Sequence, residues 1–199
     1  MNPIISKKQK IADKAEAILV GAMREFMVCG YAAASMDRIA VSAGVSKPTL
    51  YSYFKDKEGL FTALIHYMTQ SNRLLDGERF LKHPIRDSLK LLAIDFLDKF
   101  SGDEPLLTLF RLIIGESGRF PNLAQTFVRD FEKPMLEKLS YLLAHHPKLK
   151  IVDTEITARF FVGSIMHYGI VQEILQGKEI LPIERNRFID GLIELIVTE

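Results

Sequence analysis

The sequence predicts an all-α protein of about nine helices, and three observations support this. Apolar residues recur at three- and four-residue spacing through most of the 199-residue chain, which is the period of a helix that buries one face. The alternation with period two that marks a half-buried strand is nearly absent. No Asn-Gly pair of the kind that closes a tight hairpin occurs.

The composition is that of an ordinary globular protein, with 48% hydrophobic and 26% charged residues. The net charge of +1 gives the whole chain no strong attraction to nucleic acid or to a membrane. The charge is unevenly placed, because residues 1–60 carry a net +3 and the remainder a net −2. The sequence therefore indicates a weakly basic N-terminal head on a slightly acidic body.

Cysteine content and hydropathy indicate the compartment. Cys29 is the only cysteine, so neither a disulfide framework nor a thiolate metal cluster is expected. The N-terminal residues are polar and basic, unlike a secretory signal. The longest stretch without charge, Phe160–Gln172, has thirteen residues, whereas a membrane span needs roughly 20. A soluble, cytoplasmic protein without a membrane partner is expected.

The first helix is predicted from about Lys8 to Cys29. Its apolar residues form one stripe, and Gly30 supplies the left-handed stop that helix ends favour. The members of the stripe are Ile11, Ala15, Ile18, Ala22 and Phe26. A second, short helix follows Ser35, whose hydroxyl can accept a hydrogen bond from an unpaired backbone N–H, and it ends at Gly44.

The third helix is predicted to begin after Ser46, a favourable N-cap residue. Pro48 is tolerated there because a residue of the first turn has no intrahelical N–H bond to lose. Leu50 and Phe54, four residues apart, can both face inward. Helix, short glycine turn and second helix together match the helix-turn-helix pattern.

Helical segments are also predicted through the rest of the chain. One begins near Lys57, and a break follows near residues 82–84. Pro134 is expected to kink or break the long segment in which it lies. The further segments are expected at about 85–101, 105–117, 121–145, 153–176 and 183–197.

The predicted third helix carries the candidate DNA-contacting residues. In helix-turn-helix proteins the N-terminal part of the second helix meets base edges. Lys47, Pro48, Thr49 and Ser52 suit that role, while tyrosine hydroxyls and Lys57 suit phosphates. The alternative is a solvated helical hairpin with half-buried tyrosines. The full candidate set is Ser35, Ser46, Lys47, Pro48, Thr49, Tyr51, Ser52, Tyr53 and Lys57.

The stretch from about Ile11 to Leu64 closely resembles the DNA-binding domain of TetR-family transcriptional regulators. The residues that carry this resemblance are Ala22, Phe26, Gly30, Tyr31, the run 35–40, Ala43 to Ser46, Thr49 to Tyr51, Tyr53, Phe54 and Lys57 to Leu60. The run Arg119-Phe120-Pro121-Asn122-Leu123 is similar to the C-terminal domain of the AefR-like subgroup. One departure is Pro48, where the family often has glycine, which stiffens the start of the helix.

The resemblance implies a homodimeric, usually repressing regulator that binds a palindromic operator in double-stranded DNA and responds to a small molecule. The DNA-binding domain would comprise residues 1–56, and residues 57–199 would bind the effector and dimerise. The resemblance places Thr49, Tyr51, Tyr53 and Lys57 on DNA. A basic arm, residues 1–10 with Lys7, Lys8 and Lys10, either approaches the minor groove or phosphates or is a solvated tail.

The dimer is expected to form through the helices at about 153–176 and 183–197. The first of these is apolar on nearly every side over residues 160–171, and a helix of that kind is buried all round. The second contributes Phe188, Ile189, Leu192, Ile193 and Ile196. The alternative is that the first helix is the central core helix of a monomer.

A largely apolar effector pocket with a few polar groups is predicted in the C-terminal domain. For each candidate, packing in the core is the alternative role. The candidates are Phe96, Phe100, Phe110, Arg111, Ile113, Phe127, Phe131, Met166 and His167. Effector binding to a state with wrongly spaced DNA-binding heads would release the DNA, with the helix that begins near Lys57 as the lever.

Two rival functions are an enzyme and a protein–protein adaptor. Enzymatic activity is not expected, because the run Gly115-Glu116-Ser117-Gly118 departs from the spacing of a nucleophile elbow and follows no strand. His145-His146 lacks a carboxylate at helical spacing, so neither a metal nor a cofactor is expected. The second rival is a helical protein–protein adaptor that no longer binds DNA.

Overall fold

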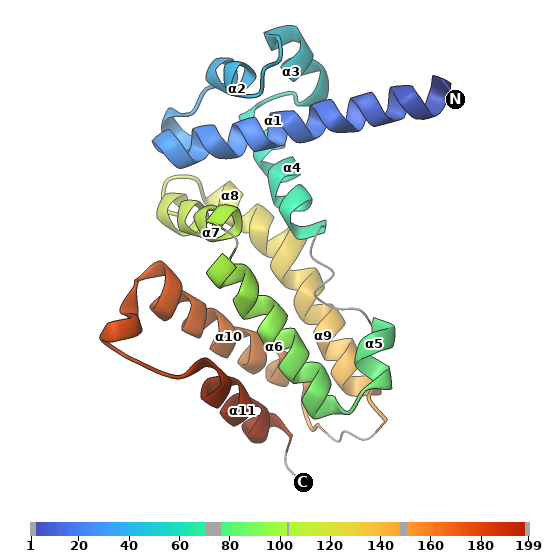
Figure 1. Ribbon diagram of the computed structural model, residues 1–199, viewed down its shortest axis with the longest axis vertical. Coiled ribbons are helices and arrows are strands. Elements are labelled where there is room, and N and C mark those ends of the chain that lie inside the picture. Colours follow the sequence, from blue (N-terminus) through green and yellow to red (C-terminus); the bar gives the residue numbers. More distant parts are fainter. Residues whose placement is uncertain (1–2, 71–76, 103, 148–150, 198–199) are drawn as a thin grey trace. The chain divides into compact units, whose positions relative to one another are not determined.

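The computed structural model describes residues 3–70, 77–102, 104–147 and 151–197 (Figure 1). Within these ranges the regular secondary structure is helical and includes no β-strand, which confirms the predicted all-α class. The α-helices are α1 (Pro3–Ala33), α2 (Met36–Ser42), α3 (Lys47–Tyr53), α4 (Lys57–Gln70), α5 (Gly77–Lys82), α6 (Ile85–Gly102), α7 (Glu104–Glu116), α8 (Pro121–Phe127), α9 (Lys133–His145), α10 (Thr154–Gly169) and α11 (Arg185–Ile196).

The chain packs into two compact units. Unit 1 contains Met1–Ser71 and Thr108–Phe131, and unit 2 contains Asn72–Leu107 and Glu132–Glu199. The segment 108–131 thus packs with the helix-turn-helix region although it lies far from it in the sequence. The functional boundary after residue 56 stays a prediction.

Helix α1 is amphipathic and breaks near its end. Ile18, Ala22 and Phe26 are buried, as the predicted apolar stripe requires. Gly30 has φ 74° and ψ 169°, a conformation that essentially only glycine adopts, so the break lies where the sequence predicts the helix end. The helix begins earlier than predicted, at Pro3. The expected basic arm is therefore helical along most of its length, rather than a tail preceding the helix.

Helix α2 packs closely on α1, α3 packs on α2, and both have the predicted caps (Figure 1). Ser35 Oγ accepts from the N–H of Arg38 at 3.3 Å, and Ser46 Oγ accepts from the N–H of Thr49 at 3.3 Å. Gly44, with φ 67°, turns the chain between the two helices. Gly21 of α1 lets α2 approach, since a Cβ there would lie 2.8 Å from the backbone nitrogen of Ala43.

An aromatic cluster forms the core of unit 1 where α1, α4 and the start of α8 meet. The Phe26 and Tyr31 ring centroids are 5.5 Å apart, and Tyr31 lies 5.4 Å from Phe61. Phe120 packs edge-on against Tyr31 at 5.0 Å. Such pairs stabilise a core beyond the area that they bury. They fasten the segment 108–131 to the helix-turn-helix region.

Unit 2 is a bundle in which α10 packs on α9 and α6, and α11 packs on α6 and α10 (Figure 1). The short helix α5 was not predicted. The predicted kink occurs as the π-helical turn Val128–Glu132, after which α9 restarts with Pro134 in its first turn. Proline has no N–H for the preceding turn, so the hydrogen-bond ladder is rearranged just before it. A second π-helical turn, Ile170–Ile174, ends α10, and Gly177–Glu179 form a 3-10 turn.

Candidate nucleic-acid interface

The outer surface of α3 presents most of the predicted DNA-contacting residues. Leu50 is fully buried and anchors the helix on unit 1, while Phe54 at its C-cap is half-buried. Lys47, Pro48 and Ser52 are exposed, and 51% of Tyr51 is accessible. The geometry is that of a rigid helix whose outward face is free to meet another molecule.

A set of hydroxyl groups fixes the N-terminal turn of α3. Ser46 Oγ lies 2.8 Å from Thr49 Oγ1, and Ser52 Oγ donates to the Thr49 carbonyl at 2.6 Å. Thr49 and Tyr53 are half-buried rather than enclosed. The Tyr53 ring lies 6.3 Å from that of Phe54. Both residues keep part of their surface available outside the protein.

The ammonium group of Lys47 is paired in the free protein. Its Nζ lies 2.5 Å from Oδ2 of Asp37, in the first turn of α2. Both side chains are more than half exposed, so water screens the pair and its contribution to stability is small. Lys47 can exchange this partner for a base or a phosphate at little cost.

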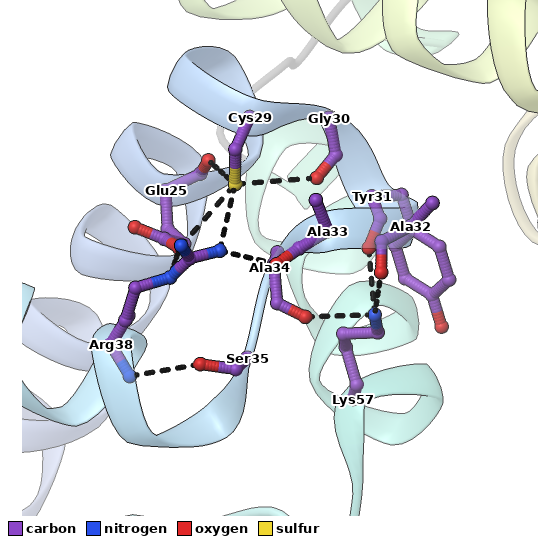
Figure 2. Close-up of polar contacts among 10 residues, drawn as sticks. All are labelled: Glu25, Cys29, Gly30, Tyr31, Ala32, Ala33, Ala34, Ser35, Arg38 and Lys57. Atoms are coloured by element: carbon purple, nitrogen blue, oxygen red, sulfur yellow. Dashed lines mark hydrogen bonds and ion pairs between the residues drawn. The ribbon is translucent and has the colours of Figure 1, made fainter.

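Lys57 and Ser35 are placed differently from the α3 residues. Figure 2 shows Nζ of Lys57 directed at the end of α1, where it donates to the carbonyls of Tyr31, Ala32 and Ala34 at 2.7, 3.2 and 2.9 Å. The same nitrogen lies 4.5 Å from the centroid of the Tyr31 ring, within cation–π range. Ser35 caps α2 and is half-buried.

Arg38 and Asp37 belong to this region but were not among the predicted residues. The guanidinium of Arg38 pairs with Oε1 of Glu25 at 2.5 Å and also donates to the Ala33 carbonyl and to Cys29 Sγ (Figure 2). The sequence carries a weak signal for these contacts, because the partners of Arg38 lie five to thirteen residues away. Local helical spacing does not relate residues on different helices.

Comparison with known proteins identifies the family of the domain that carries this surface. Residues 18–64 match the family model of bacterial regulatory proteins of the tetR family. Residues 87–198, more than half of the chain, match the model described as the C-terminal domain of AefR-like transcriptional repressors. The chain belongs to the TetR family. It is therefore a transcriptional regulator with a DNA-binding helix-turn-helix. The family resemblance of residues 11–64 is confirmed.

Relatives of this TetR-family chain match it over nearly its whole length. YhgD of Bacillus subtilis (strain 168), an uncharacterised HTH-type transcriptional regulator, is 42% identical over 195 residues, which cover 94% of this chain and 96% of YhgD. A TetR-family regulator from Mesorhizobium loti superimposes with a TM-score of 0.75 at 25% identity, covering 93% of this chain and 95% of its own. The flavonoid-responsive regulator FrrA gives 0.71 at 29% identity, with 91% of both chains covered.

The residues predicted for an effector pocket in this TetR-family chain are divided between the two units. In unit 1 the ring centroids of Phe110 and Phe127 are 5.1 Å apart, and Phe127 and Phe131 are 5.0 Å apart. Ile113 and Arg111 also lie in unit 1. The side chain of Ile113 is buried, whereas that of Arg111 is exposed. The shared pocket therefore stays a prediction.

The remaining pocket candidates lie in unit 2. Phe96 is buried in α6, and the side chain of Phe100 lies outside the described part of the chain. Met166 is half-buried in α10, whereas His167 is exposed, so the expected burial of α10 on every side does not hold within one chain. Packing within unit 2 covers the other side of this helix.

An apolar stripe remains exposed along α10 and α11. On α10 it follows helical spacing through Ile156, Phe160 and Gly163, and the exposed polar side chain of His167 lies at its end. Leu195 of α11, 72% exposed, joins Ile156 and Phe160 in lining a groove of about 310 Å³. The sequence predicts the dimer contact through these two helices, but with other residues of α11. Ile189, Leu192 and Ile193, named for that contact, are buried within the single chain, because this side of α11 packs on α6 and α10.

The imidazole rings of His145 and His146 each form a hydrogen bond with a backbone carbonyl. His145 Nδ1 lies 2.8 Å from the carbonyl of Tyr141, and His146 Nε2 lies 3.1 Å from that of His83.

Among the helices that the structure describes, none has both the length and the apolar composition needed to cross a bilayer.

Proposed function

We propose that this TetR-family regulator is a repressor that binds a palindromic operator as a homodimer and is released by a small, largely apolar effector. The observation that supports this best is the outward face of α3, where exposed Lys47, Pro48, Tyr51 and Ser52 stand on a helix anchored by buried Leu50. A rigid helix with such a face suits the major groove of DNA.

The proposed contacts fall into two classes. Lys47, Pro48, Thr49 and Ser52, near the N-terminal end of α3, would meet base edges and so select the sequence. Tyr51 and Tyr53 would contact phosphates, which position the protein without reading the bases. Ser46 holds the first turn through its contact with Thr49. Ser35 supports α2 as its cap.

A dimer is proposed because one helix-turn-helix offers few contacts. Two copies whose recognition helices lie roughly 34 Å apart would reach successive major grooves on one side of the duplex. The exposed stripe on α10 and α11 is a suitable contact surface, since Phe160 and Leu195 are large, apolar and exposed in the single chain. In a dimer with two-fold symmetry, the stripe of one subunit would pack against the same stripe of the other.

Release by an effector is proposed as a shift between two states of the dimer. The effector would favour a spacing of the heads that does not match the operator, so DNA and effector would weaken each other's binding by the same factor. The proposed lever is α4, which contacts the segment 108–131 within unit 1, where His66 Nε2 lies 3.4 Å from Oδ2 of Asp130. The described response of FrrA to flavonoids supports a small-molecule effector.

The test is DNA selection followed by a binding titration. Wild-type protein would select duplexes from a random pool, and the affinity for the selected duplex would be measured by fluorescence anisotropy at several salt concentrations. A symmetric site, two chains per duplex and a steep loss of affinity with salt are expected. Failure to select any duplex would favour the protein–protein adaptor instead.

A further inference from the structure

We propose that Lys57 is a positioning residue: together with Arg38 it clamps the end of α1 and so holds α2 and α3 at the angle required for DNA. We define the clamp as Lys57, Arg38 and the carbonyls of residues 31–34. The effect on DNA binding rests on the function proposed above, whereas the clamp itself is a property of the free protein.

The end of a helix leaves four carbonyls without an intrahelical partner. At the end of α1 all four carbonyls of residues 31–34 accept from two cations (Figure 2). Lys57 takes those of Tyr31, Ala32 and Ala34, and Arg38 takes that of Ala33. Cations are favoured at this end of a helix because its carbonyls carry partial negative charge.

An ammonium group has three N–H donors and no acceptor. Lys57 uses three acceptors, at 2.7 to 3.2 Å, so in this arrangement no donor remains for a phosphate. The ring of Tyr31 covers the same group from 4.5 Å. A lysine held in this way differs from Lys47, which pairs with the exposed carboxylate of Asp37 in a contact that water screens.

The clamp joins the three elements that set the pose of the recognition helix. Lys57 is the first residue of α4, the four carbonyls end α1, and Arg38 lies in α2, which leads into α3. Arg38 also pairs with Glu25, one turn before Cys29 on α1. Because α1 breaks at Gly30, its last turn is not held by a continuous helix. Hydrogen bonds from the two cations to the carbonyls of residues 31–34 hold this turn in place.

Lys57 is partly buried, and two acidic side chains lie near it. Burial lowers the pKa of Lys57, and the electrostatic influence of Cys29 and Glu116 opposes part of that shift. Oε1 of Glu116 would lie only 3.1 Å from a Cβ placed on Gly30, so this carboxylate sits against the break in α1.

The test compares Lys57→Met and Lys57→Arg with the control Lys55→Met, which removes an exposed lysine two residues away. Affinity for a duplex selected by the wild type would be measured at several salt concentrations. Both Lys57 variants are expected to bind at least tenfold more weakly with an unchanged salt slope. A lost phosphate contact would instead reduce that slope by about 0.9. Wild-type affinity in Lys57→Arg, or a reduced slope in Lys57→Met, would overturn the proposal.

A second measurement is independent of DNA. Amide hydrogen exchange in residues 31–42 of the free protein is expected to quicken in both Lys57 variants and to stay unchanged in Lys55→Met. Unchanged exchange in the Lys57 variants would overturn the clamp even if DNA binding is altered. Should Lys57→Met fail to fold, Lys57→Arg decides, because it keeps the charge but its planar guanidinium cannot converge on the same three carbonyls. If the wild type binds no DNA, only the proposed function fails.

Discussion

The Nζ atom of Lys47 lies 2.5 Å from Oδ2 of Asp37, across the turn that separates α2 from α3. A residue proposed to read bases is therefore held by a carboxylate when DNA is absent. Asp37 also places a negative charge on the surface that would face phosphates. DNA must compete with Asp37 for the same ammonium group.

Asp37→Asn is expected to tighten DNA binding two- to fivefold at low salt, since an exposed ion pair of this kind is worth roughly 0.2–1 kcal/mol. The variant frees Lys47 and removes repulsion from the phosphates. Anisotropy titrations at two salt concentrations would measure the effect, with Asp87→Asn on α6 as the matched control. Weaker binding in Asp37→Asn would mean that the pair orients Lys47 for recognition.

Thr49→Ala and Tyr53→Ala are expected to act in different ways. Loss of Thr49 should lower the ratio of specific to non-specific affinity, because one good base contact is worth about 1–3 kcal/mol of discrimination. Loss of Tyr53 should weaken binding to all duplexes alike. Competition titrations with selected and scrambled duplexes separate the two results. Identical behaviour of both variants would contradict the division into base and phosphate contacts.

Tyr31→Phe is expected to reduce the loss of stability at alkaline pH. Burial, followed by the charges of Glu58 and Asp56, raises the pKa of Tyr31 from 10.0 to about 12. The unfolded chain loses this proton first, so the stabilisation is complete below pH 10 and is lost as the pH rises toward 12. A shift of this size corresponds to roughly 2–3 kcal/mol.

Urea unfolding of Tyr31→Phe and wild type at several pH values from about 9 to 12 would measure this difference. The phenylalanine ring keeps the packing on Phe26, Phe61 and Phe120, so the comparison isolates the hydroxyl. Parallel loss of stability in both proteins would show that Tyr31 titrates normally.

Gly21→Ala is expected to lower the free energy of unfolding by about 1–3 kcal/mol, the usual cost of overpacking a close contact. The added Cβ would lie 2.8 Å from both the nitrogen and the Cβ of Ala43, so the end of α2 must move away from α1. Urea unfolding measures the loss. Gly115→Ala is the control, because a Cβ there meets no described atom within 4 Å and should stabilise by up to about 1 kcal/mol.

Leu195→Glu is expected to convert the proposed dimer to monomers. The substitution places a charge on the stripe of α10 and α11, where Leu195 is 72% exposed and lines the groove with Phe160. Analytical ultracentrifugation would measure the mass in solution, and DNA affinity should fall together with dimerisation. Val28→Glu, which places a charge at an apolar residue of α1 that is 84% exposed, should leave the mass unchanged. A dimeric Leu195→Glu protein would place the interface elsewhere.

The sequence by itself determined the all-α class, the helix-turn-helix and its caps. Ser35, Gly44 and Ser46 act on atoms no more than a few residues away, so their roles follow from short-range hydrogen-bond geometry and backbone preference. The family resemblance of residues 11–64 rests on the same local pattern. The start of α1 and the short helix α5 were missed, because weak propensity in short or terminal segments sets no clear boundary.

Only the tertiary structure decided how the side chains of different helices pair. The carbonyls that bind Lys57 lie 23 to 26 residues before it, and Glu25 lies thirteen residues before Arg38. The exposure of His167 likewise depends on which side of α10 the bundle covers. Spacing along the chain defines the face of a helix, but the neighbour that meets this face is chosen by the packing of the whole unit.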